Sequence, residues 1–125
     1  MKWWSMLRQN ECCGILAGVN GKSVKLYRTT NIEHNPYCFS IDPRELVNIY
    51  QEIRENKWNL LGIYHSHTHT NAYPSPADIR SAYLPEAVYL IISLSSPDHA
   101  IVKGFYILEN KVTEIELKII EKGDE

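Results

Sequence analysis

Two histidines at alternate positions, His65 and His67, have the types and spacing that most clearly suggest chemistry in this chain. Side chains of an extended strand alternate between its two faces, so both imidazoles point one way and Ser66 points the other. After seven intervening residues, Ser75-Pro76-Ala77-Asp78 has the pattern of a helix start. Two imidazole nitrogens and one carboxylate oxygen give three protein ligands and leave a fourth tetrahedral position for water, which is the arrangement of a catalytic zinc.

Each part of this pattern also has an ordinary structural interpretation. Ser75 and Asp78 form a capping box, in which each side chain bonds to the main chain of the other residue. A pair of histidines at the end of a strand is often simply exposed. Glu11, which directly precedes a hydrophobic segment, is by itself typical of a solvated charge at a strand edge. The combination is therefore more informative than any single part.

The combination resembles the complete signature of the JAMM (MPN+, Mov34/JAB) zinc metalloproteases. That signature is a glutamate well upstream, followed by H-x-H-x(7)-S-x-x-D. The matching residues here are Glu11, His65, His67, Ser75 and Asp78. NECCGILAG around the glutamate, the Asp-Pro start of a helix, GIYHSH, PSPAD and a strand bearing Phe105 extend the resemblance over nearly the whole chain. They are similar to the compact bacterial and archaeal members.

The resemblance implies a role for each of these residues. His65, His67 and Asp78 would hold one zinc ion per chain. Glu11 would be the general base, which takes a proton from water and later passes it to the leaving amine, because a metal ligand cannot do this freely. Ser75 would donate to the developing oxyanion, so it would serve both the helix cap and the transition state. The implied fold is the JAB/MPN fold, which is similar to that of cytidine deaminases.

The family that the chain resembles contains deubiquitinases, non-catalytic scaffolds, and compact prokaryotic enzymes that cut after the Gly-Gly tail of ubiquitin-like proteins. The short segment after His67 leaves little room for the insertions of deubiquitinases, which favours the compact class. We therefore expect a metallopeptidase or isopeptidase that acts on a ubiquitin-like or sulfur-carrier protein. It would release an amino acid such as cysteine, trim the tail, or cleave a conjugate. The alternative is a non-catalytic scaffold. Ser66 disfavours the branch associated with DNA repair, which carries His-Asn-His.

Two features depart from the family pattern. Only ten residues precede Glu11, so either the N-terminal strand and helix are shortened or the beginning of the chain lies upstream of this sequence. Trp3 and Trp4 would then be partly exposed, which suggests self-association as a homodimer. Thr68 stands where the family usually has proline, which predicts a looser loop after the histidines.

The remaining histidines are weaker candidates. His69 continues the alternation of His65 and His67. It is either a spare ligand or proton shuttle, or, in the interpretation we favour, an exposed residue or a neighbour of the ligands. His34 and His99 lie in loops without partners in sequence, and we assign them no role.

Cysteines and tyrosines near the pattern have ordinary interpretations as well. Cys12 and Cys13 adjoin the proposed base, but no nearby histidine or helix start marks either as a nucleophile, so packing is expected. Tyr64 should face away from the ligands and pack in the core. Tyr73 follows in the loop, where contact with substrate is the alternative to a merely exposed side chain.

Composition limits the class of protein and its partners. A chain of 125 residues fits one domain, spanning 1–125. Hydrophobic residues make up 44% and charged residues 22%, the formal net charge is -2, and no basic run suggests binding of nucleic acid or of a membrane surface. The longest apolar run, Ala87 to Leu94, is too short to span a bilayer, and no signal peptide is evident. We therefore expect a cytoplasmic protein with reduced cysteines.

The order of elements predicts an α/β (α+β) protein with a mixed, mostly antiparallel sheet flanked by two or three helices. Asn20-Gly21 predicts a hairpin between residues 12–19 and 23–29. Asp42-Pro43 with Glu45 predicts a capped helix to about Asn56. We further expect part of a helix at 1–10, strands at 60–65, 87–94, 100–108 and 112–120, a short helix from Ser75 closed by Pro85, and a frayed tail at 121–125.

Overall fold

The structure, a computed structural model, describes residues 12–32, 41–68, 70–82, 84–95 and 98–118. The expected N-terminal helix and the C-terminal tail lie outside these residues. The described chain forms six strands and two helices. They are β1 (Cys13–Val19), β2 (Lys22–Thr29), α1 (Pro43–Glu55), β3 (Asn59–His67), α2 (Pro76–Ser81), β4 (Val88–Ser93), β5 (Ile101–Leu108) and β6 (Lys111–Ile115).

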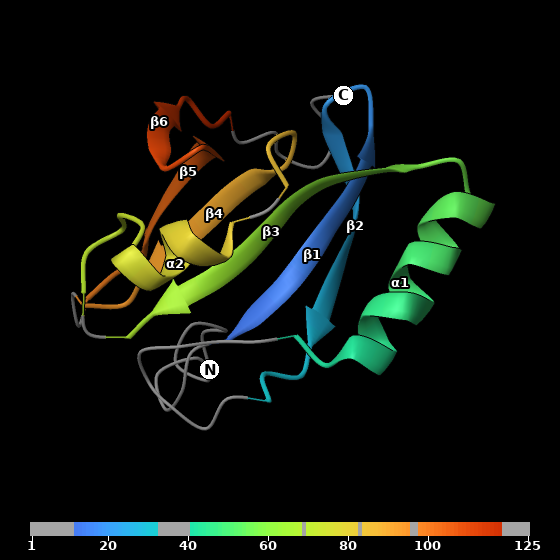
Figure 1. Cartoon of the computed structure of the whole chain (residues 1–125), viewed down its shortest axis with the longest axis horizontal. Coiled ribbons are helices and arrows are strands. Elements are labelled where there is room, and N and C mark those ends of the chain that lie inside the picture. The colour runs from blue at the N-terminus through green and yellow to red at the C-terminus, as the bar shows by residue number, and fades with distance from the viewer. Residues whose placement is uncertain (1–11, 33–40, 69, 83, 96–97, 119–125) are drawn as a thin grey trace.

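The six strands form one mixed sheet in the order β2-β1-β3-β4-β5-β6. Only the β3–β4 pair is parallel, and the other four pairs are antiparallel. Parallel neighbours need a crossover connection, and here α2 lies in it. Figure 1 shows α2 lying over the β3–β4 part of the sheet, with α1 beside β1 and β2. The predicted α+β class with a mostly antiparallel sheet is confirmed.

The predicted hairpin has the expected turn. Asn20 and Gly21 have φ angles of 53° and 79°, the positive values that a two-residue turn matching the twist of its strands requires. The turn sets β1 against β2, with Cys13 opposite Thr29. This end of β1 is the one that approaches the histidines, because Cys13 is also opposite His65 of β3.

The start of α1 differs in one detail from the prediction. Asp42 caps the helix by accepting from the Arg44 main-chain N–H at 2.9 Å, and Pro43 follows it as expected. Glu45, which we expected to close a capping box, instead accepts from the main-chain N–H and the hydroxyl of Thr30, at 2.7 and 2.8 Å. A more distant partner therefore replaces the local one and ties α1 to the end of β2.

The two helices cover one face of the sheet. Ile49 and Ile53 of α1 pack on Ile15 and Ala17 of β1. Ile79 of α2, together with neighbouring residues, packs on a second cluster that contains Ile63, Tyr89, Ile91, Phe105 and Ile107. None of the described helices is long and apolar enough to cross a membrane.

Several elements differ in length from the predictions. β3 continues to His67 instead of ending at residue 65, and α2 ends at Ser81 well before Pro85. β6 ends at Ile115, whereas the pattern predicted a strand to residue 120. Pairing with neighbouring strands decides the bounds of β3 and β6. His67 remains in the sheet because it pairs with Ser93 of β4.

The packing of β5 leads to a test of the core. Phe105 is fully buried, whereas Val102 on the same strand is 47% exposed. Phe105→Ala should lower the free energy of unfolding by about 3–5 kcal/mol, because it removes a buried ring and leaves a cavity. Val102→Ala is the matched control and should cost less than about 1 kcal/mol. Chemical denaturation measures both, and equal losses would contradict the placement of Phe105 in the core.

Candidate metal centre

His65 and His67 lie in the last three residues of β3, on the face that the helices cover. Their exposed fractions are 1% and 3%. The ordinary interpretation of exposed strand-end histidines is therefore wrong. Burying two imidazoles in one place is unfavourable unless their nitrogens find partners.

The start of α2 supplies the third side chain. Asp78 accepts from the main-chain N–H of Ser75 at 2.8 Å, and the Asp78 N–H donates to the Ser75 hydroxyl oxygen at 3.1 Å. These two bonds make the predicted capping box, with Pro76 at the first helical position. Because both bonds are made to the main chain, the box fixes the carboxylate of Asp78 on the first turn of the helix.

Three side-chain atoms converge between β3 and α2. His67 Nε2 lies 2.9 Å from Asp78 Oδ2, and His65 Nε2 lies 3.1 Å from the same oxygen. The two Nε2 atoms are 3.1 Å apart. Among the described residues, these three form a group whose ligand atoms all lie within 4.8 Å of one another. The structure thus brings together the three residues that the sequence suggested as metal ligands.

A second contact determines which nitrogen of His67 faces this cluster. His67 Nδ1 lies 2.9 Å from the carbonyl oxygen of Asn71. A carbonyl oxygen only accepts, so Nδ1 carries the hydrogen and the neutral ring keeps a lone pair on Nε2. The loop that holds Asn71 is fixed in turn, because the Ser93 hydroxyl donates to the Thr70 carbonyl at 2.6 Å. The ring is thus held with its metal-binding nitrogen towards Asp78.

The electrostatics favour the metal-binding forms of these groups. Burial acts to raise the pKa of Asp78, but the two imidazoles beside the carboxylate and the Ser75 main-chain N–H outweigh burial and hold the pKa well below its usual range. Burial lowers the pKa of His65, although Asp78 acts in the opposite direction. An ionised carboxylate and neutral imidazoles are the forms that bind a metal ion.

The donor set fits a divalent cation. Three potential ligand atoms lie 2.9–3.1 Å apart, and either a hydrogen shared among them or a metal ion offsets the repulsion of their lone pairs. Imidazole nitrogen and carboxylate oxygen are common zinc ligands, and three of them leave a coordination position for water. The residues present therefore fit zinc.

The other predicted residues have different places. Glu11 and His69 lie outside the described residues. Cys13 is buried, as expected of a packing residue, and burial raises the pKa of the Cys12 thiol, which disfavours the reactive thiolate. Tyr64 is buried with Ile92 and Leu94, which confirms that it packs in the core.

Tyr73 is half-exposed in the loop before α2. Its ring meets the edge of Phe105 with a centroid distance of 5.5 Å. The predicted contact with substrate stays a prediction. Packing on Phe105 does, however, give this exposed ring a fixed position.

Sequence reasoning missed Ser93 and Asn71. Ser93 left one signal, since it is a lone polar residue in the apolar run AVYLIISL. Ser93 is only 1% exposed, so its hydroxyl requires a hydrogen-bond partner within the protein. Asn71 acts through its main-chain carbonyl, which no side-chain pattern reports.

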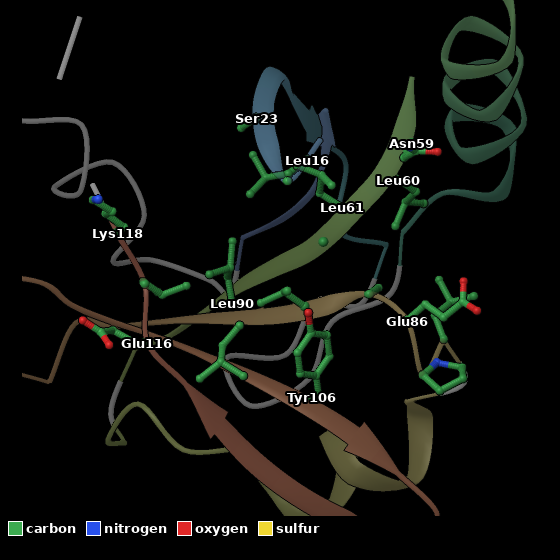
Figure 2. Close-up of a pocket in the computed structure, with 18 of the residues that line it drawn as sticks. Leu16, Ser23, Asn59, Leu60, Leu61, Glu86, Leu90, Tyr106, Glu116 and Lys118 are labelled. Atoms are coloured by element: carbon green, nitrogen blue, oxygen red, sulfur yellow. The ribbon is translucent and has the colours of Figure 1, made fainter. Parts of the chain in front are cut away.

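A pocket of about 1090 Å³ lies at the opposite end of the strands from the three ligands. Its lining includes Asn59, Leu60 and Leu61 at the start of β3, whereas His65 and His67 end that strand. Figure 2 shows Leu16, Leu90 and Tyr106 along its walls and Glu86, Glu116 and Lys118 around it. The pocket is therefore separate from the candidate metal centre.

Comparisons with known proteins agree with this geometry. A curated relative named CysO-cysteine peptidase, from Mycobacterium tuberculosis, is 31% identical over 115 residues, which cover 90% of this chain and 79% of the relative. Proteins named desampylase from Pyrococcus furiosus and Haloferax volcanii are 26% and 35% identical. These matches cover 87% and 66% of this chain, and 76% and 62% of the relatives.

Solved structures share the fold. The solution structure of a protein from Desulfitobacterium hafniense has a TM-score of 0.81 and 38% identity, covering 95% of this chain and 88% of that one. The solution structure of a protein from Salinibacter ruber, at 20% identity and a TM-score of 0.64, covers 95% and 83% and shows the fold alone. The family described as prokaryotic homologs of the JAB domain matches residues 5–103, which include the metal centre and Glu11. The chain belongs to this family.

Proposed function

We propose that this chain is a zinc-dependent peptidase that cleaves after the C-terminal Gly-Gly of a ubiquitin-like or sulfur-carrier protein. The convergence of His65, His67 and Asp78 is the observation that carries this proposal. The names of the relatives, CysO-cysteine peptidase and desampylase, support a peptidase as the class of enzyme.

In this proposal His65, His67 and Asp78 hold one zinc ion. Zinc with three protein ligands is a Lewis acid that makes water a strong nucleophile near neutral pH. The site residues contribute by position. His67 is oriented by its bond to the Asn71 carbonyl, and Asp78 by the capping box with Ser75. Both ligands are thus oriented by bonds to the main chain independently of the metal, which favours its binding.

Ser75 is proposed to stabilise the transition state. Its oxygen accepts from the Asp78 N–H, and a hydroxyl that accepts in this way retains one O–H to donate. We propose that this O–H donates to the oxyanion that develops on the scissile carbonyl. The cap on α2 and the oxyanion contact are compatible, because they use different parts of one hydroxyl.

Glu11 is proposed to be the general base. A carboxylate that is not a metal ligand takes a proton from the attacking water and passes it to the leaving amine. Support comes from the next residue along the chain. Cys12 is hydrogen-bonded to Ser66, which lies between the two histidine ligands. This contact brings the main chain that follows Glu11 to the candidate metal centre.

Zinc binding is the first test. His67→Ala should weaken zinc binding by at least about 100-fold, because a ligand and its fixed orientation are both lost. His99→Ala is the matched control, since His99 is an exposed loop histidine, and it should bind zinc like the wild type. Competition with a chromogenic chelator measures both affinities. Equal affinities for the two variants would place the metal elsewhere.

Activity is the second test. The substrate is a ubiquitin-like protein whose tail ends in Gly-Gly-Cys, and mass spectrometry follows release of the cysteine. Glu11→Gln should reduce kcat by about 100- to 10,000-fold while zinc content is retained, because it removes the general base. Chelation should abolish cleavage by the wild type, and added zinc should restore it.

Three results would contradict parts of this proposal. If the zinc-loaded wild type cuts neither this tail nor a Gly-Gly isopeptide bond to lysine, the substrate class is wrong. If Glu11→Gln cleaves like the wild type, Glu11 is not the base. If the wild type binds no zinc, the non-catalytic scaffold becomes the better interpretation.

A further inference from the structure

Ser66 lies between the two histidine ligands but belongs to the other face of the sheet. Successive side chains of β3 alternate, so His65 and His67 reach the metal centre while Ser66 points away from it. Ser66 is only 1% exposed, and burying a hydroxyl is unfavourable without a hydrogen bond. Its role is therefore not to bind the metal, and its partner lies within the protein.

That partner is Cys12, which precedes the first residue of β1. The Cys12 main-chain N–H donates to the Ser66 hydroxyl oxygen at 2.8 Å. The Ser66 N–H donates to the Cys12 carbonyl oxygen at 2.9 Å. Two bonds from one residue therefore hold both main-chain polar groups of Cys12.

The Cys12 N–H is bonded to a side chain of β3, at a place in the sheet where a main-chain carbonyl would be the usual acceptor. The register of β1 and β3 sets Cys13 opposite His65 and Gly14 opposite Tyr64. The contact between Cys12 and Ser66 continues this antiparallel pairing by one residue. A side-chain oxygen supplies the acceptor there, and a substitution at residue 66 can remove it, whereas a main-chain carbonyl cannot be removed in this way.

The Cys12 N–H belongs to the peptide unit that joins Cys12 to Glu11. A peptide unit is planar, so the bond that holds the Cys12 N–H limits how this unit can rotate, and the proposed base is covalently attached to the unit. We propose that Ser66 is a positioning residue for Glu11, the general base. This inference rests on the proposed function. One strand thus supplies two ligands on one face and constrains the base from the other.

Ser66→Ala, Ser66→Thr and Tyr64→Phe form the matched set that tests this inference. Ser66→Ala removes the acceptor for the Cys12 N–H, and Ser66→Thr retains a hydroxyl. Tyr64→Phe removes a different hydrogen bond from the same face of β3, the one that the Tyr64 hydroxyl donates to the Tyr27 carbonyl at 3.3 Å. It leaves Cys12 and its contacts intact, so it controls for general loosening of the strand.

With the Gly-Gly-Cys substrate, Ser66→Ala should lower kcat by about 10- to 100-fold, a part of the contribution expected of a general base. KM and zinc affinity should stay within about threefold of the wild type, because no ligand or substrate contact changes. Ser66→Thr and Tyr64→Phe should retain kcat within about threefold. In the Glu11→Gln background, Ser66→Ala should have no further effect, because both changes act on the same group.

A readout that does not depend on activity accompanies the kinetics. Amide hydrogen exchange of Cys12, followed by NMR, should become at least about tenfold faster in Ser66→Ala and stay unchanged in Tyr64→Phe, since only the first removes the partner of this N–H. If Ser66→Ala does not fold, Ser66→Cys replaces it. A thiol is a weaker acceptor, so this variant should show a smaller loss of kcat with the same normal KM and zinc affinity.

The inference is overturned if Ser66→Ala, or Ser66→Cys in its place, retains the wild-type kcat, or loses zinc in proportion to activity, or adds its full effect to that of Glu11→Gln. These results differ from failure of the proposed function. If the proposed function is wrong, the zinc-loaded wild type itself cleaves neither the Gly-Gly-Cys tail nor the Gly-Gly isopeptide bond. The inference about Ser66 is then wrong as well.

Discussion

The close approach of three potential metal ligands determines what the surrounding fold must do. His65 Nε2, His67 Nε2 and Asp78 Oδ2 lie 2.9–3.1 Å apart in a buried place, where their mutual repulsion is poorly screened. A hydrogen shared among them, or a metal ion that they bind together, makes the arrangement favourable. The fold must therefore hold two elements together at this point and exclude most of the water.

The sheet and the crossover meet this requirement. β3 presents both imidazoles from one face, and the parallel pairing of β3 with β4 requires a connection that returns over that face. α2 lies in this connection, and its first turn carries Asp78. Two adjacent residues of the loop between them are held by hydrogen bonds, Thr70 by the Ser93 hydroxyl and Asn71 by the His67 ring. These hydrogen bonds help to hold the short crossover that carries the third ligand, Asp78.

Much of the site is predictable from the sequence because local rules govern it. Strand alternation places His65 and His67 on one side, and the capping box at Ser75 and Asp78 needs only the spacing within one turn. The Asn-Gly hairpin is local in the same sense. The family resemblance adds Glu11, which no local rule connects to the histidines.

The remainder depends on contacts between distant segments. The place of His67 in the sheet follows from its pairing with Ser93, and the bond between Ser66 and Cys12 follows from the register of β1 and β3. Glu45 is an example of what local patterns cannot predict. Its position predicted a capping box within α1, whereas its carboxylate accepts from the main-chain N–H of Thr30. Sequence spacing specifies which groups are available, and the tertiary structure decides which of them meet.

X-ray absorption spectroscopy of the zinc-loaded protein is the most direct test of the proposed metal centre, because it reports the elements and distances around the metal without a substrate. We predict one zinc per chain with nitrogen and oxygen ligands only, at about 2.0–2.2 Å. Two imidazoles should contribute to the spectrum, and one position should belong to solvent. A sulfur ligand at about 2.3 Å, or a shell with four protein ligands, would contradict the claim of an open catalytic centre.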